Sequence, residues 1–486
     1  MSLKNKSYKA FAWDFTGNVA GQSVGFIISI FLARLLTPED FGLLAMVNVV
    51  IALSSSLVDM GLGVALIQRK EVTQEHYGSV FFFNIAIGTF LAALLFLAAP
   101  LVSVFYDNDQ LIPIARTMAF LFILRSIGNV LRVKLQKELQ YAIPTKANIL
   151  AAISSGIVGI SMAFNGFGVW SLVAQSIINP IVANSYIFYV FKWRPKLVFK
   201  WQALKELWGF GFRMFLSGLL DSIFKNADSL IIGRLFSPAT LGFYFRARSL
   251  NQNITQYSSH SIINILFPTL SKVQDDLERF KRMVFKGYHL INLLAFFLTG
   301  LFFVIGSDLI LFLFGDKWQA SIPLFKLIIL TAYAHPLSAM LVNILMASGN
   351  SKKFLEVEVI KKTIFGLALG FGFLWGIEGY LFANIIAYIL AVWVNIYFAV
   401  KQLETGQWYI IKITIPYLLI TVIVAYALSY IMQYFENSHL LNLIIGSALY
   451  SLFFIIFARL LKLYGLALLL KEIKGFDIIN KLKRNI

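Results

Sequence analysis

Apolar runs of about twenty residues recur along the whole chain and are separated by short polar segments. A bilayer core about 30 Å thick needs roughly 20 apolar residues for one helical crossing, so each run is long enough to span a membrane. With 59% hydrophobic and 14% charged residues, the chain has more apolar surface than a soluble core can bury. The sequence therefore predicts an all-α integral membrane protein with no room for a soluble catalytic domain.

Counting the runs predicts about fourteen transmembrane helices. The eighth is the most polar, since Arg248 and Gln252 lie within it. The predicted spans cover residues 11–33, 41–66, 78–105, 111–131, 147–165, 168–191, 209–233, 241–268, 286–314, 321–347, 354–375, 378–400, 410–434 and 440–463.

The Lys and Arg residues of the loops test this count, because cytoplasmic loops are enriched in them. With the N-terminus inside, the outer loops hold only Arg34, Arg234 and Lys317. Leaving out the eighth span would invert every later loop and destroy the asymmetry. We therefore expect both termini in the cytoplasm.

The net charge of +18 is dispersed between apolar runs, which indicates a membrane surface and not nucleic acid. The basic residues expected on the cytoplasmic side of the membrane include Lys134, Lys137, Lys352, Lys353, Lys481, Lys483 and Arg484.

The chain also contains an internal repeat at an offset of 200 residues. The string Arg-Leu-Leu-Thr-Pro-Glu-Asp-Phe-Gly ends at Gly42, and Arg-Leu-Phe-Ser-Pro-Ala-Thr-Leu-Gly ends at Gly242. Duplicated bundles of this kind build transporters that rock one half against the other. The predicted division is an N-terminal lobe of six helices (1–191), a cytoplasmic linker with an interfacial helix (192–208), a second six-helix lobe (209–400), and two further helices with a basic cytoplasmic tail (401–486).

Polar residues recur at helical spacing inside several spans. A charge at mid-membrane is costly, so these residues are expected to face a cavity and not lipid. Excess positive charge in a low-dielectric cavity attracts anions, and phosphate suits both Arg and Lys. The candidate cavity residues are Asn18, Gln22, Arg125, Asp221, Lys225, Asp228, Arg248, Gln252, Lys361 and Lys362.

Packing roles are the alternative for several of these charges. Lys225 could pair with its neighbours Asp221 and Asp228, and Glu358 could neutralise Lys362. Arg246 is expected near the outer membrane interface, and the sequence leaves open whether it contacts lipid headgroups. His260 and His335 stand alone and are expected to pack. Arg116 and Arg125 point to opposite sides of one helix, and Arg125 is favoured for the cavity.

Several kinds of chemistry are excluded or disfavoured by the sequence. The chain has no cysteine, which excludes disulfides and thiolate metal sites. It has no phosphate-binding loop motif of the ATPase type. The Asp107-Asn-Asp109 string has the spacing of a metal-binding motif, but in a short outer loop it is expected to be a helix-capping turn. We expect no catalytic residue, metal or cofactor.

Five strings give the chain a family resemblance over essentially its whole length. In order and spacing, the sequence resembles the Wzx-type polysaccharide transporter family of the multidrug/oligosaccharidyl-lipid/polysaccharide exporter superfamily, and within it the WzxC-like exporters. The strings that carry the resemblance are residues 34–44, 67–71, 136–139, 266–275 and 314–318.

The resemblance implies a flippase that carries an undecaprenyl-diphosphate-linked oligosaccharide across the bacterial inner membrane. It also implies two six-helix lobes around a cationic cavity, with polysaccharide polymerase machinery as a candidate partner. Two other classes remain as alternatives. A drug or cation exporter would have an acidic cavity and usually twelve spans, and a glycan polymerase or glycosyltransferase would have a large outer loop.

Overall fold

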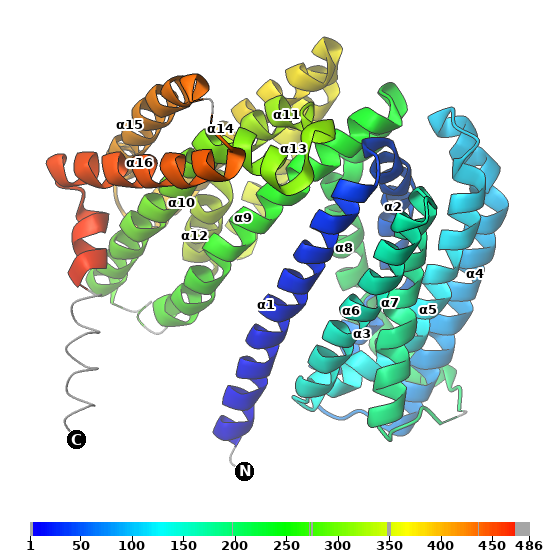
Figure 1. The fold of residues 1–486 in the computed structure, drawn as a ribbon. Coiled ribbons are helices and arrows are strands. Elements are labelled where there is room, and N and C mark those ends of the chain that lie inside the picture. The colour runs from blue at the N-terminus through cyan, green and yellow to red at the C-terminus, as the bar shows by residue number, and fades with distance from the viewer. Residues whose placement is uncertain are drawn as a thin grey trace, which may run out of the picture. The chain divides into compact units, whose positions relative to one another are not determined.

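Helices make up nearly all of the chain in the computed structural model (Figure 1). The structure describes residues 3–196, 198–271, 273, 276–347, 351–435 and 437–471, and within them there is no strand. The helices are α1 (Leu3–Leu35), α2 (Pro38–Asp59), α3 (Leu62–Gln68), α4 (Gln74–Tyr106), α5 (Leu111–Lys137), α6 (Ala142–Phe164), α7 (Val169–Val190), α8 (Trp201–Leu235), α9 (Pro238–Ser271), α10 (Leu277–Phe314), α11 (Ser321–Ile329), α12 (Ala334–Ala347), α13 (Ser351–Gly372), α14 (Gly376–Gln402), α15 (Gln407–Ile431) and α16 (His439–Leu460), with short 3-10 helices η1 (Asp316–Trp318), η2 (Phe373–Trp375) and η3 (Met432–Tyr434).

Every predicted span is mainly helical in the structure, including the polar eighth, which lies within α9. By length and composition, nine segments of the described chain are apolar enough to cross a membrane, one of them running through both α13 and α14. The multi-pass, all-α prediction is thus confirmed, while the count of fourteen crossings stays a prediction. The basic cluster at residues 481–484 lies outside the described residues.

Two predicted spans are each divided into two helices. The span at 41–66 breaks after Asp59, because Met60 and Gly61 adopt left-handed backbone conformations with φ of 44° and 71°. A side chain at Gly61 would meet the backbone carbonyl of Gly211 in α8, so this turn needs a glycine. The span at 321–347 breaks between α11 and α12, where the hydroxyl of Thr331 bonds the carbonyl of Ile328 and competes with the helical pattern.

The predicted interfacial helix is the first part of a longer helix. It begins at Trp201 and continues without a break through the predicted seventh span to Leu235 as α8. This helix packs on α2, α3 and α4. Leu204 and Leu207 share one hydrophobic core with Leu66 of α3 and Val130 of α5.

By its contacts the chain divides into two units, Met1–Phe245 and Arg246–Ile486, and α9 passes from one to the other. In the first unit α4 packs on α5, α6 packs on α7, and α1 packs on α6 (Figure 1). In the second, α13 packs on α14, and α10 packs on both α15 and α16. The predicted lobes follow the sequence repeat and stay a prediction.

The repeated strings fold into the same local structure. The hydroxyl of Thr37 accepts the backbone N–H of Asp40, and that of Ser237 accepts the N–H of Thr240, each at 3.2 Å. A proline at the first helical position follows each cap, where its missing N–H costs nothing. Residues 34–42 therefore start α2 as residues 234–242 start α9.

These two helix starts also pack against each other. A Cβ atom added at Gly42 would lie 1.7 Å from the carbonyl oxygen of Pro238, and one added at Gly242 would lie 1.9 Å from the carbonyl oxygen of Pro38. The contact is reciprocal, as a twofold relation between the repeats requires. Each copy of the string thus supplies the glycine that the proline carbonyl of the other copy needs. We call this pair of contacts the glycine interlock.

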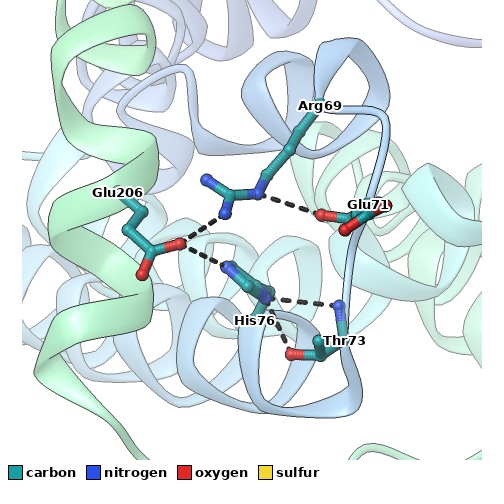
Figure 2. Close-up of polar contacts among 5 residues, drawn as sticks. All are labelled: Arg69, Glu71, Thr73, His76 and Glu206. Carbon is teal, nitrogen blue, oxygen red and sulfur yellow. Dashed lines mark hydrogen bonds and ion pairs between the residues drawn. The ribbon is translucent and has the colours of Figure 1, made fainter.

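Within the first unit, side chains also attach the start of α8 to the end of α3 and the start of α4. Figure 2 shows Glu206 between Arg69 and His76. Its Oε2 lies 2.5 Å from Nη2 of Arg69 and 3.2 Å from Nε2 of His76. The backbone N–H of Thr73 lies 3.2 Å from Nδ1 of His76 and can only donate, so Nδ1 accepts and Nε2 carries the proton given to Glu206. We call Arg69, Thr73, His76 and Glu206 the linker clasp.

Neighbouring contacts extend the clasp along the linker. Lys200 pairs with Glu75 at 2.5 Å, and Nε1 of Trp193 donates to Oε1 of Gln74 at 2.8 Å. The backbone N–H of Lys200 also donates to Oγ of Ser79. The linker is therefore fastened to the start of α4 on both sides of its non-helical stretch.

We expect Gly42→Ala and Gly242→Ala each to destabilise the protein. The added methyl group meets a backbone carbonyl that cannot rotate away, and overpacking of this kind costs about 1–3 kcal/mol or more. The measurement is the melting temperature of the detergent-purified protein. Gly218→Ala is the matched control, because a Cβ at Gly218 of α8 has open space around it. Wild-type melting temperatures for both interlock variants would contradict the reciprocal packing.

The clasp predicts a pH dependence of stability. The hydrogen bond from His76, aided by the charge of Arg69, holds the pKa of Glu206 below its ordinary value. In the unfolded chain the pKa of a glutamate is about 4.3. Because folding lowers the pKa of Glu206, its carboxylate stabilises the protein at pH values above about 4.3. This stabilisation is lost as the pH falls through the pKa of the folded state. We expect Glu206→Gln to lower the melting temperature at pH 7, and the difference from wild type to shrink below about pH 4.3.

Glu71→Gln serves as the control for that series, because Glu71 contributes only its backbone carbonyl, which accepts from Nε of Arg69 at 2.9 Å. It should melt like the wild type throughout. A difference between wild type and Glu206→Gln that stays constant down to pH 3 would show that the carboxylate charge is not what stabilises the clasp.

Candidate functional site

A cavity of about 300 Å³ lies within the first unit, between α2, α5 and α7. Polar and charged side chains form most of its wall, which is unusual for the interior of a membrane bundle. The lining residues are Ser55, Val58 and Asp59 of α2, Arg125, Asn129 and Arg132 of α5, and Asn179, Pro180 and Asn184 of α7.

Helix α5 supplies both cations of the cavity. Arg125, Asn129 and Arg132 are spaced by four and three residues, so an α-helix of 3.6 residues per turn places them on one face. The two arginines are seven residues apart, which is about 10 Å along the helix axis. Long side chains can therefore bring both guanidinium groups to a single ligand.

Neither guanidinium is neutralised by a carboxylate within the described part of the chain. Nη1 of Arg125 donates to Oγ of Ser55 at 2.8 Å, and Nη1 of Arg132 donates to Oδ1 of Asn148 at 2.9 Å. Both acceptors are neutral, and a guanidinium has five N–H donors. Each arginine thus keeps its full charge and most of its hydrogen-bonding capacity for an anion in the cavity.

Asp59 is the acidic residue of the cavity wall, and it is bonded by neutral donors. Its Oδ1 accepts from Nδ2 of Asn129 at 2.7 Å and from Nδ2 of Asn84 at 3.3 Å. Its carboxylate also accepts the backbone N–H of Gly63, with oxygens at 3.0 and 3.1 Å. Asp59 therefore caps the start of α3 and connects α2 with α4 and α5.

The third wall, α7, approaches α5 closely. Nδ2 of Asn184 donates to the carbonyl of Leu124 at 2.6 Å, and a Cβ at Gly128 would lie 2.1 Å from Oδ1 of Asn184. The absence of a side chain at Gly128 is what allows this approach. Asn179, one and a half turns earlier on α7, donates weakly to Oγ of Ser155 at 3.4 Å.

Of the residues predicted for the cavity, the structure places Arg125 on this wall, while Arg116 lies outside it over the ring of Phe96 at 5.0 Å. The other predicted residues do not line this cavity, and the side chain of Asn18 lies outside the described residues. Exposed positions are Gln22 on α1, Asp221 and Lys225 on α8, and Gln252 on α9, whereas Arg248 of α9 and Lys361 and Lys362 of α13 are half-buried.

Two predicted cavity residues have contacts typical of packing. Asp228 is 7% exposed, and its carboxylate accepts the hydroxyl of Tyr244 at 2.5 Å and the backbone N–H of Ser229 at 2.7 Å. Lys361 pairs with Glu358 at 2.5 Å, three residues away. A pairing of Glu358 with Lys362 was one alternative from the sequence, and the pair described here joins Glu358 to Lys361.

Arg246, for which headgroup contact was open, is buried in the second unit. Its guanidinium lies 4.7 Å from the ring centroid of Phe314 and 5.2 Å from that of Trp318. At 5% exposure it cannot reach headgroups. Residues 314–318 form one of the strings that carry the family resemblance, and this stacking gives that string a physical role.

Sequence reasoning missed most of this cavity. Arg132 follows the predicted fourth span and falls in a loop expected on the cytoplasmic side, although its spacing from Arg125 already indicated a shared face. Asn129 shares a helical face with Arg125, and Asp59 lies in the predicted span 41–66, but neither was among the candidate cavity residues. Asn179 and Asn184 carried no signal beyond being amides in an apolar run. Within the described chain, no group of three His, Asp or Glu side chains could hold a metal ion.

Comparison with known proteins now gives the family. The chain matches the model of the polysaccharide biosynthesis protein family over residues 31–323. It is 27% identical over 411 residues to an uncharacterized membrane protein in the cps region of Klebsiella pneumoniae, which covers 82% of this chain and 84% of that protein. It is 24% identical over 446 residues to the lipopolysaccharide biosynthesis protein WzxC of Escherichia coli strain K12, which covers 89% of each chain. Its fold resembles the lipid II flippase MurJ in an inward closed conformation, with a TM-score of 0.69 and 15% identity over 92% of this chain and 99% of that one. The chain therefore belongs to the polysaccharide biosynthesis protein family and has the fold of that flippase.

Proposed function

We propose that this protein is a flippase that moves an undecaprenyl-diphosphate-linked oligosaccharide repeat unit across the bacterial inner membrane. Family membership and the names of relatives in lipopolysaccharide, teichuronic acid and succinoglycan biosynthesis support a role in glycan export. The observation that carries the proposal is the cavity with two guanidinium groups that have no carboxylate partner among the described residues.

The cavity chemistry suits the diphosphate of such a lipid. A diphosphate that leaves the headgroup region loses its hydration, and charge-assisted hydrogen bonds from guanidinium groups can replace it. Low-dielectric walls strengthen the attraction. The amides of Asn129, Asn179 and Asn184 offer further donors and acceptors beside the arginines, in the manner that sugar hydroxyls require.

The expected orientation places this cavity toward the cytoplasm. With both termini inside, α5 runs from the outer to the inner side, so Arg132 lies nearer the cytoplasm than Arg125. In alternating access the site would open first to the inner leaflet, where the loaded lipid is made, and then to the outer leaflet.

An exporter of organic cations fits the cavity less well. Such a substrate needs an excess of carboxylates, whereas the charged residues of this wall are one carboxylate and two arginines, and the carboxylate already accepts amide and backbone hydrogen bonds. The two arginines would repel a cation. The balance of charge therefore favours an anionic substrate.

The direct test of this proposal is mass spectrometry of lipid-linked intermediates in the source cells with and without the protein. Without it, a complete undecaprenyl-diphosphate oligosaccharide should accumulate while the exported polymer disappears. The accumulated species would also identify the glycan. Intermediates of every length at unchanged levels would overturn the proposal and turn attention to drug or ion export.

Arginine variants test the cavity. Arg125→Ala and Arg132→Ala should each reduce polymer export by about tenfold or more, because one charge-assisted hydrogen bond contributes about 1.5–3 kcal/mol. Protein abundance in the membrane should not change. Arg116→Ala is the matched control, since Arg116 lies on the same helix but outside the cavity, over Phe96. Equal export by all three variants would refute the cavity assignment.

A further inference from the structure

We infer that Asp59 is a fixed counter-charge that limits how tightly the cavity holds the diphosphate, so that the substrate can leave. This inference rests on the proposed function. It assigns to one carboxylate a role in substrate release, beyond its packing contacts between helices.

The first observation is where Asp59 lies. It shares the cavity wall with Arg125 and Arg132, so the three charged side chains that line the cavity leave a single excess positive charge. A carboxylate in this position repels any anion that the two arginines attract. The interaction between unit charges in such surroundings is strong, because water screens it only partly.

The second observation is what Asp59 bonds. A carboxylate near two arginines would ordinarily pair with one of them and neutralise it. Here the partners of Asp59 are Asn84, Asn129 and the backbone N–H of Gly63. Neutral donors thus hold the carboxylate in place, and both guanidinium groups stay available to the substrate. The charge of Asp59 acts on the cavity without blocking its cations.

A carrier needs such a balance. Binding must be favourable enough for the substrate to enter and weak enough for it to leave, as in any permeation pathway. Two guanidinium groups on one diphosphate, with no opposing charge, would form a trap. A resident carboxylate weakens the bound state without removing any hydrogen bond to the phosphate groups.

A purely structural role makes the opposite prediction. Asp59 caps α3 and connects it to α4 and α5, so its loss could loosen the cavity wall. A loosened wall would bind an anion more weakly. Only the counter-charge role predicts that removing the carboxylate charge strengthens binding, so the sign of the change in affinity separates the two.

The experiment measures binding of inorganic pyrophosphate to the purified full-length protein in nanodiscs by isothermal titration calorimetry. Asp59→Asn keeps the size of the side chain and removes its charge. We expect its Kd to fall by about tenfold relative to wild type, while polymer export in cells decreases. Asp107→Asn, which removes an exposed carboxylate outside the cavity, should leave both quantities unchanged.

A relocated charge gives a second readout if Asp59→Asn folds poorly. Asn179→Asp adds a carboxylate to the opposite wall, where the hydroxyl of Ser155 can donate to it. This variant should bind pyrophosphate about tenfold more weakly than wild type. The double variant Asp59→Asn with Asn179→Asp should return toward the wild-type Kd.

The outcomes separate the inference from the proposal beneath it. Wild-type protein that binds pyrophosphate, with Asp59→Asn binding equally or more weakly and Asn179→Asp unchanged, would overturn the counter-charge and leave the flippase proposal standing. Wild-type protein that binds no pyrophosphate would overturn the anion cavity itself. Tighter binding by Asp59→Asn together with reduced export would establish the inference.

Discussion

An arginine inside a membrane bundle must have a partner or a polar space, and this constraint organises the polar chemistry of the chain. Arg116 and Arg246 satisfy it by lying over aromatic rings, with their charge directed at the electron-rich face. Arg125 and Arg132 have no such ring and no carboxylate in the described chain, and the space beside them is the cavity. On the proposed function, the bound diphosphate offsets the cost of this buried positive charge.

The fold was largely predictable, because apolar length and loop charge are properties of local sequence. All fourteen predicted segments are helical, even the polar eighth. The two breaks were not predictable from apolar length. The break in 321–347 accompanies a local hydrogen bond from the Thr331 hydroxyl to the carbonyl of Ile328, whereas the break in 41–66 depends on a contact between distant segments. Gly61 turns the chain because α8 approaches it, and no pattern around residue 61 reports the position of Gly211. The continuity of α8 was missed for the same reason, because its first turns are held by the linker clasp and by packing against Leu66 and Val130.

The site was less predictable than the fold, because hydropathy reports burial but not partners. Asp221, Lys225 and Asp228 have the spacing of one helical face, yet Asp228 turns to the hydroxyl of Tyr244 on the next helix. Conversely, Arg132 looked like an ordinary charge at the end of a helix. Only the positions of α2 and α7 show that its face of α5 borders a cavity. A residue's depth can be read from sequence, whereas the helix it faces cannot.

The glycine interlock gives both copies of the short string a structural role, since each glycine accommodates the proline carbonyl of the other copy. The cavity, by contrast, lies within one unit. All of its lining residues come from α2, α5 and α7 of the first unit. On the proposed function, a diphosphate bound there would keep its guanidinium partners whichever side of the membrane the cavity faces. Its release must then depend on the strength of binding within that unit, and Asp59 is the group placed to set that strength.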